Sequence, residues 1–305
     1  MEELKSAYYE VTFRNRFVES TGDSFQDLFS TIMEMRYPGD FVRVRPWGNV
    51  GDRKNDGYLR SARKLFQCFA PRGMKLARCI NKINEDFTTA LPFWREYFDE
   101  WVFTHNDVKG LPADVLKLLL DLSATHQPVA ATHWGYPELL TEFKRLSPAN
   151  VATLLGSAPG LKDVVDVRLE DIKRLLRHIA LQPEPLVADV RVVPAAKLQH
   201  NQLSDAAATL LKAGMTRAEI VKKYLRGLAD PTRHDRIAAA FRLRYEELRG
   251  DGLPPDEILA GLQKFVAGDR VTSPSHQAAT LAILAFFFEV CDVFERPSDE
   301  TSMPS

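Results

Sequence analysis

Cysteine is scarce in this sequence of 305 residues. Only Cys68, Cys79 and Cys291 are present, and they show neither the spacing of a metal-binding motif nor an obvious pairing. The composition therefore argues against a scaffold held by disulfides. It predicts reduced thiols in a cytoplasmic protein.

Long apolar runs are missing as well. The longest, 278–288, is far shorter than the roughly 20 residues that a membrane-spanning helix needs, so we expect a buried helix and no membrane partner. The N-terminus, MEELKSAYYE, is acidic and polar, which is not the pattern of a signal peptide.

Nucleotide-binding loops and zinc patterns are not found. The sequence has neither a P-loop nor a dinucleotide fingerprint, so no nucleotide-hydrolysing machinery is expected. The seven histidines are scattered. His105 follows a predicted strand near a candidate site, where a structural hydrogen-bonding role is favoured over that of a base.

Net charge is close to zero, at -1, which does not indicate a polycation that seeks nucleic acid. The positive charges are nevertheless concentrated. Between Arg36 and Lys82 the sequence has twelve Lys or Arg against three Asp, an excess of nine positive charges. This basic belt suits a phosphate-bearing ligand, and a solvated positive face is the alternative. The candidate nucleic-acid-binding residues are Arg43, Arg45, Arg53 and Lys54.

The stretch 48–71 is the most informative part of the chain. Glycines 48, 51 and 57 indicate bends, and the apolar run 65–69 predicts an interior strand. Asp52 and Asp56 then lie at strand ends beside a central strand that carries Gln67. Carboxylates placed in this way can hold a hard divalent cation. The alternative is a β-hairpin whose Asp and Asn residues only make turns.

Helices and strands alternate through the first half of the chain. Apolar residues at helical spacing predict a helix from Phe25 that ends before Pro38, and others over 74–91, 112–120 and 137–146. Strands are expected over 40–46, 65–69, 101–105 and 128–134. This order predicts an α/β fold with a mixed sheet flanked by helices.

The second half is nearly all helical, so we expect an all-α C-terminal domain. Predicted helices cover 205–212, 217–226, 233–249, 256–266 and 275–294, with caps at Ser204 and at Thr216. The expected domains are an α/β domain over 1–150, a helical connector and linker over 151–200, a helical domain over 201–297 and a disordered tail over 298–305.

Several motifs resemble proteins of bacterial ABC-three-component systems. The N-terminal ones are Phe25-Gln26 and the segments 45–48, 51–52, 55–58 and 66–71; the C-terminal ones are Gln277-Ala-Ala and the segments 287–289, 291–292 and 294–297. The resemblance implies a component of an anti-phage defence complex with an SMC-like ABC ATPase as partner.

The N-terminal half also resembles the PD-(D/E)XK restriction-endonuclease-like fold, whose core runs helix, three strands, helix, strand. Matched residue by residue, Asp56 takes the place of the metal-binding Asp and Gln67 that of the Glu or Gln. The usual lysine is replaced by Phe69, and the helix acid by Gln26. Residues from elsewhere in the fold could replace them: Lys64, Lys54 or Lys75 could replace the missing lysine, and Glu34 could replace the missing helix acid.

Two functions follow from these resemblances. In one, an adaptor with a degenerate or atypical nuclease-like domain binds its partner and, as a further ligand, DNA. In the other, a Mg²⁺- or Mn²⁺-dependent DNA endonuclease uses Asp56, Gln67 and Lys64, with the metal held by Asp56, Asp52 and Glu34. In both, the last helix docks the partner through Phe287, Phe288, Asp292 and Phe294, whose aromatic surface and nearby acids suit an apolar patch with a polar rim.

Overall fold

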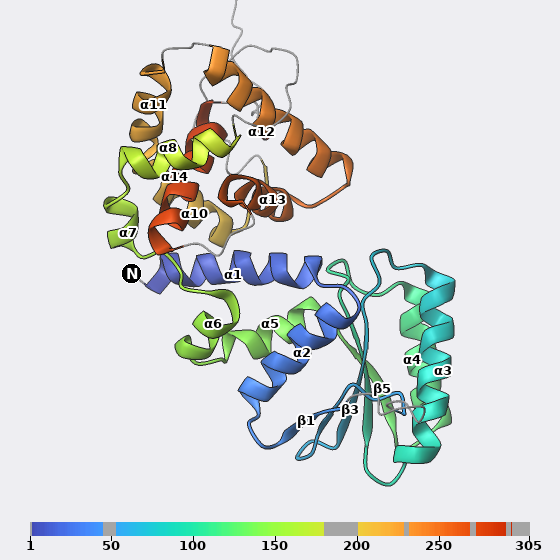
Figure 1. Ribbon diagram of the computed structural model, residues 1–305. Helices are drawn as coiled ribbons and strands as arrows, with labels where there is room; N and C mark the ends of the chain where they lie inside the picture. Colours follow the sequence, from blue (N-terminus) through green and yellow to red (C-terminus); the bar gives the residue numbers. More distant parts are fainter. Residues whose placement is uncertain are drawn as a thin grey trace, which may run out of the picture. The chain divides into compact units, whose positions relative to one another are not determined.

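The computed structural model describes residues 2–44, 53–179, 201–228, 232–268, 273–290 and 294 (Figure 1). By its internal contacts the chain divides into two units. One unit is Arg16–Val151, and the other combines Met1–Asn15 with Ala152–Ser305. We call them the α/β unit and the helical unit. The predicted boundaries of 1–150 and 201–297 differ from this division, because the first fifteen residues group with the helices of the second half.

A mixed sheet of five strands forms the centre of the α/β unit (Figure 1). The strands are β1 (Phe41–Arg43), β2 (Gly57–Leu59), β3 (Lys64–Phe69), β4 (Glu100–His105) and β5 (Ala130–Trp134), and they lie side by side in chain order. β1, β2 and β3 pair antiparallel, whereas β3, β4 and β5 pair parallel. The mixed sheet expected from the alternation of elements is thus confirmed.

Helices cover both faces of this sheet. α3 (Leu76–Trp94) and α4 (Ala113–Thr125) are the crossovers between the parallel strands, and they share a core with Leu65, Trp101 and Phe103. α2 (Asp23–Arg36) and α5 (Tyr136–Lys144) belong to the opposite face, where Phe29 of α2 meets Phe66 with ring centroids 5.1 Å apart. Successive residues of β3 therefore point to opposite layers, as strand geometry requires.

Gly57 has a different role from the one expected. It lies within β2, opposite Phe66, and not at a bend. A Cβ at this position would fall 2.7 Å from Cε2 of the Phe41 ring, so the missing side chain makes room for an aromatic ring of the edge strand. Glycines 48 and 51 lie outside the described residues.

The helical unit contains the start of α1 (Glu2–Glu19), the end of α6 (Pro148–Leu155) and the helices that follow α6. These are α7 (Leu161–Val165), α8 (Leu169–Ile179), α10 (Asp205–Met215), α11 (Ala218–Arg226), α12 (Thr232–Gly250), α13 (Pro255–Ala267) and α14 (Pro274–Val290). The cap at Ser204 is confirmed, because its hydroxyl accepts from the Ala207 amide at 3.2 Å. The cap at Thr216 is wrong, since α11 begins after Arg217 and the Thr216 hydroxyl donates to the Ala213 carbonyl.

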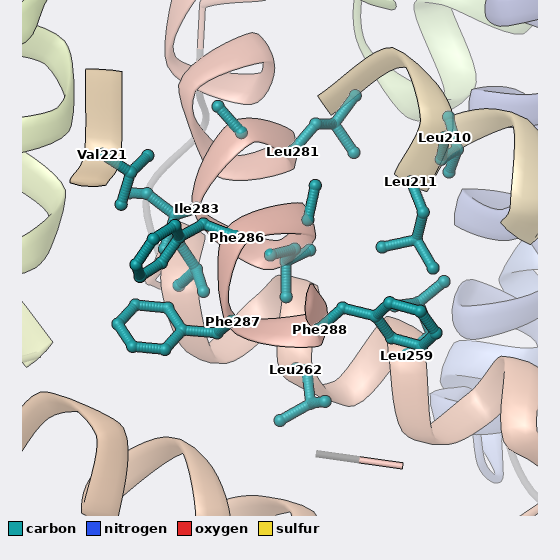
Figure 2. Packing of buried hydrophobic residues seen from close by; sticks show 14 of the residues in the cluster. Leu210, Leu211, Val221, Leu259, Leu262, Leu281, Ile283, Phe286, Phe287 and Phe288 are labelled. Carbon is teal, nitrogen blue, oxygen red and sulfur yellow. The ribbon is translucent and has the colours of Figure 1, made fainter. Parts of the chain in front are cut away.

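α14 is the centre of the helical unit. Leu281 on one side of this helix, and Ile283 and Phe287 on another, are each at most 1% exposed (Figure 2). Helices α10, α11, α13, α8 and α7 all pack against α14. A helix that is apolar all round is stable in water only when its neighbours cover it, which is the arrangement found here. Among the described residues, no helix is both long enough and apolar enough to cross a membrane.

Candidate functional site

Asp56 lies directly before β2 and joins three elements of the α/β unit. Its Oδ1 accepts a hydrogen bond of 2.7 Å from the Gln26 side-chain amide on α2, and its Oδ2 accepts one of 2.7 Å from the Cys68 backbone amide on β3. Asp56 is only 5% exposed. A buried carboxylate is costly unless donors surround it, and these two donors meet that need.

The charge on Asp56 influences its neighbour. Burial raises the pKa of the Cys68 thiol well above its ordinary value, and the nearby Asp56 carboxylate raises it further. Burial likewise raises the pKa of the Cys79 thiol, to about 11. Both thiols are therefore protonated at neutral pH, and neither is a nucleophile.

Gln67 and Phe69 lie on the face of β3 that α3 covers. Gln67 is 5% exposed, and its Oε1 has no hydrogen-bond partner within the described parts of the chain. Phe69 packs against Phe103, with ring centroids 6.0 Å apart, and the Arg78 guanidinium lies 5.6 Å from its ring. The position where nuclease relatives carry a lysine is therefore part of an apolar core, with one cation at its edge.

Two of the three candidate lysines have carboxylate partners of their own. Lys64 lies 2.9 Å from Glu100 Oε2, and its ammonium is 5.9 Å from the centre of the Trp134 ring. Lys54 lies 2.7 Å from Glu85 and 3.2 Å from Asp86, both on α3. The third candidate, Lys75, is the exposed residue before α3.

Asp86 was not found by sequence reasoning. It is fully buried, and the Lys82 ammonium lies 2.9 Å from its Oδ1 and 2.8 Å from its Oδ2. Burial raises the pKa of Asp86, and the charges of Lys82 and Lys54 partly offset this effect. The spacing of Lys82 and Asp86 on one helix was an available signal, but such spacing is common on exposed helix faces.

Glu34 does not join Asp56. It is eight residues beyond Gln26 on α2, which is about 12 Å along the helix axis. Both of its oxygens accept from the Arg43 guanidinium, at 3.0 and 3.1 Å. Asp52, the remaining predicted metal ligand, lies outside the described residues. Within the part of the chain that the structure describes, no three His, Cys, Asp or Glu residues gather closely enough to hold a metal ion.

Much of the basic belt is paired with acids. Arg43 also contacts Asp27 at 2.7 Å and Thr31 at 3.2 Å, so its donors point back to α2. Lys54 and Lys64 have the partners given above. Arg53 is different, since it lies over the Phe93 ring with its guanidinium carbon 5.0 Å from the centroid. Arg45 lies outside the described residues. Of the predicted nucleic-acid-binding residues that the structure describes, Arg53 is thus the one without a carboxylate partner there.

His105 ends β4 in a buried position. It is 1% exposed, stacks on Phe103 and lies 5.7 Å from the His133 ring, centroid to centroid. Burial lowers the pKa of His105 to about 4, with a further lowering from His133. A Cβ on Gly135 would fall 2.9 Å from its Cε1, so the backbone of the β5–α5 turn covers the ring. This neutral, enclosed imidazole agrees with a structural role.

Comparison with known families adds information about the second half of the chain. Residues 170–295 match the model of C-terminal domain 10 of the ABC-three component (ABC-3C) systems. Over this region the chain is similar to an ABC-3C C-terminal domain. This match supports its assignment as a component of such a system. The searches of curated proteins and of solved structures gave no match.

The residues expected to dock a partner form the core of this CTD10 region, by which we mean residues 170–295. Phe287, Phe288 and Phe294 are 1%, 3% and 4% exposed. Phe287 stacks on Phe241 of α12 with ring centroids 4.2 Å apart, and Phe288 meets Phe294 at 5.4 Å. Asp292 lies outside the described residues. These three rings are therefore buried within the described part of the chain and are not exposed for docking.

Helices α10 and α14 of the CTD10 region approach each other closely at Gly214 of α10. A Cβ on this residue would fall 2.6 Å from the Leu281 carbonyl carbon and 2.9 Å from the Ala285 Cβ, both on α14. The absent side chain lets the two backbones approach. α10 and α14 therefore form a close-packed pair that holds the aromatic cluster in place.

Proposed function

We propose that this protein is a component of an ABC-3C anti-phage defence complex in the cytoplasm. In this proposal the CTD10 region binds the SMC-like ABC ATPase or another subunit. The observation that carries the proposal is the match of residues 170–295 to an ABC-3C C-terminal domain. The scarcity of cysteine and the protonated thiols agree with a reducing compartment.

The α/β unit would then be a restriction-endonuclease-like domain with an atypical site. Its element order from α2 to β4 is helix, three strands, helix, strand, the order of that fold. The site itself favours an adaptor over an enzyme. Both Asp56 oxygens already accept hydrogen bonds, and Phe69 is a packed core residue where a lysine would position water.

The endonuclease alternative requires Mg²⁺ or Mn²⁺, and the residues described here do not fit such an ion. A hard cation of this kind takes about six oxygen ligands, several of them from carboxylates or water. Asp56 is the one predicted metal ligand that the described structure places beside Gln26 and β3. Its oxygens are occupied by an amide and a backbone N–H. We therefore place the adaptor role first.

Co-purification of the tagged full-length chain from its native operon tests the partner assignment. We expect a stable complex with the ABC ATPase or another encoded subunit. Lysine cross-linking then locates the contact: partner cross-links should involve Lys212 and Lys223 of the CTD10 region. Lys117 and Lys144, on helices of the α/β unit, are the internal control. Cross-links confined to the control lysines would move the docking surface to the α/β unit, and the absence of any bound subunit would refute the proposal.

The purified complex also separates adaptor from nuclease. We expect no cleavage of plasmid or linear DNA with Mg²⁺ or Mn²⁺, and we expect Asp56→Asn to retain phage protection. Asn keeps an acceptor for the Gln26 amide, so the fold should persist, while a metal site would lose its carboxylate. Asp121→Asn, in an exposed ion pair with Lys117, is the matched control. Metal-dependent cleavage that Asp56→Asn abolishes and Asp121→Asn does not would favour the endonuclease.

A further inference from the structure

Four aromatic residues form a partly exposed cluster on the α/β unit. They are Tyr58 of β2, Phe93 and Trp94 at the end of α3, and Tyr97 just after it. We call them the aromatic platform. Phe93 is 52% exposed and Tyr97 is 55% exposed. Their neighbours along the chain, Phe98 and Trp101, are at most 1% exposed, so core formation accounts for those two residues and not for the platform.

The platform is held together by ring contacts. Trp94 lies at its centre, with ring centroids 5.0 Å from Phe93, 6.4 Å from Tyr97 and 6.5 Å from Tyr58, on which it stacks. The Tyr58 hydroxyl donates a hydrogen bond to the Tyr97 backbone carbonyl. Two half-exposed rings are thus fixed on a semi-buried indole, and little conformational freedom would be lost when a ligand stacks on them.

Two cations without carboxylate partners in the described residues accompany the platform: one contacts a ring, and the other follows Trp94 in the chain. The Arg53 guanidinium lies over the Phe93 ring, and no acid pairs with it in the described residues. Arg95 follows Trp94 in the chain and is exposed; its guanidinium donates to the backbone carbonyls of His126 and Gln127, at 3.2 and 3.0 Å. Carbonyl oxygens orient this group without cancelling its charge. The surface therefore combines exposed π-faces with positive charge.

This combination has a specific ligand chemistry. Every nucleobase has a π-face, and stacking on aromatic side chains beside cations is how proteins bind single strands without reading their sequence. In a duplex the same faces are covered by neighbouring base pairs. A protein partner could also cover aromatic rings, but it would not need the two uncompensated guanidinium groups beside them. We propose that the aromatic platform binds single-stranded nucleic acid, with bases stacked on Phe93 and Tyr97 and phosphates near Arg53 and Arg95.

The inference goes beyond the proposed function and rests on it only for its biological setting. It does not involve Asp56, and it requires no cleavage. It also explains why part of the basic belt is paired internally while Arg53 is not. Binding would depend on salt because phosphate contacts release counterions, and it would favour single strands over duplexes because only unpaired bases can stack.

Fluorescence anisotropy with the purified full-length chain tests the proposal. The probes are a labelled 20-nucleotide oligo(dT) and a labelled 20-base-pair duplex, each at two salt concentrations. We expect the wild-type chain to bind the single strand at least about tenfold more tightly than the duplex. The double variant Phe93→Ala/Tyr97→Ala should weaken single-strand binding by at least about tenfold, the scale of one or two lost base stacks.

The matched control is Leu116→Ala/Leu120→Ala, which removes two exposed apolar side chains, 45% and 61% exposed, from α4 of the same unit. It should leave binding unchanged. Phe93→Trp/Tyr97→Trp should restore binding, and single Phe93→Ser and Tyr97→Ser variants replace the double variant if its thermal melt shows unfolding.

The proposal is overturned if the wild-type chain does not bind oligo(dT), if the duplex binds equally well, or if the platform and control variants behave alike. Loss of partner capture in the Phe93→Ala/Tyr97→Ala variant, with oligo(dT) binding unchanged, would assign the platform to a protein contact instead. Because partner capture is measured separately, failure of single-strand binding leaves the proposed function standing, and a missing partner leaves the binding result interpretable.

Discussion

Gly214→Ala is the substitution that most directly tests the packing of the CTD10 region. The change adds one methyl group in the last turn of α10 (Asp205–Met215), where α14 leaves no space for it. The new Cβ would overlap the Leu281 carbonyl group, with 2.6 Å to its carbon, and would lie 2.9 Å from the Ala285 Cβ. Both obstacles are backbone or a Cβ, so neither can rotate away. The two helices would have to separate.

Two opposing terms set the size of the effect. Alanine is about 1 kcal/mol more favourable than glycine inside a helix. Overpacking a tight core typically costs about 1–3 kcal/mol, and a clash with a backbone carbonyl belongs at or above the upper end. We therefore expect a net loss of about 2 kcal/mol in the free energy of unfolding of the helical unit. For a unit of this size, the midpoint of thermal unfolding should fall by about 4–8 °C.

Calorimetry of the full-length chain measures the midpoint of thermal unfolding. Hydrogen exchange then shows which unit unfolds at that midpoint, since a chain with two units need not unfold in one step. Peptides from α10 and α14 should exchange faster in the variant, while peptides from β3 and β4 should not change. Gly250→Ala is the control, because the space within 4 Å of its Cβ position is open. If the thermal midpoint of Gly214→Ala is equal to or above that of Gly250→Ala, the close packing of α10 against α14 is refuted.

Further predictions concern the α/β unit. Burial lowers the pKa of His105 from 6.5 to about 4. As the pH falls, His105 is therefore protonated in the unfolded state before it is protonated in the folded state. Stability should fall by about 3 kcal/mol between pH 6.5 and 4, and His105→Asn should flatten this dependence in melts across that range. Glu142→Ala removes a buried acceptor 3.0 Å from the Tyr37 hydroxyl and 3.1 Å from Arg36, and should cost about 1–2 kcal/mol in urea unfolding. Asp121→Ala, in an exposed pair, should cost less than about 0.5 kcal/mol; equal costs would contradict the role of burial. Asp56→Ala should cost about 2–3 kcal/mol in the same assay, because the Gln26 amide and the Cys68 N–H lose their acceptor, and an unchanged midpoint would refute that bonding.

Local patterns in the sequence predicted most elements of both halves. The run 65–69 became β3, and the helices expected over 205–212 and 256–266 became α10 and α13. Such elements depend on which faces are apolar, and this information is local. Thr216 failed as a cap because the preceding helix extended to Met215, an end that tertiary packing sets.

The candidate site was harder to predict from the sequence. Spacing marked Asp56 and the family resemblance marked Gln26 as notable positions, but their hydrogen bond depends on how α2 crosses the sheet. Glu34, the acid on the same helix as Gln26, lies two turns away from it and pairs with Arg43. The buried Asp86 could not be told from an exposed helix residue, because burial is a property of the neighbours.

By itself the sequence determined the order of helices and strands in the first half and the change to helical architecture in the second, because these depend on composition and on short-range periodicity. The likeness to ABC-3C proteins came from motifs, and the match of residues 170–295 supports it. Only the tertiary structure decided the partners of each side chain. Leu4, Ala7, Tyr8 and Val11 have helical spacing, yet they pack in one core with residues beyond Ala158. Phe287 and Phe288 are aromatic enough for an interface, yet Phe241 and Phe294 cover them. Contacts between residues distant in the chain are set by the three-dimensional path of the backbone, and periodicity carries no information about that path.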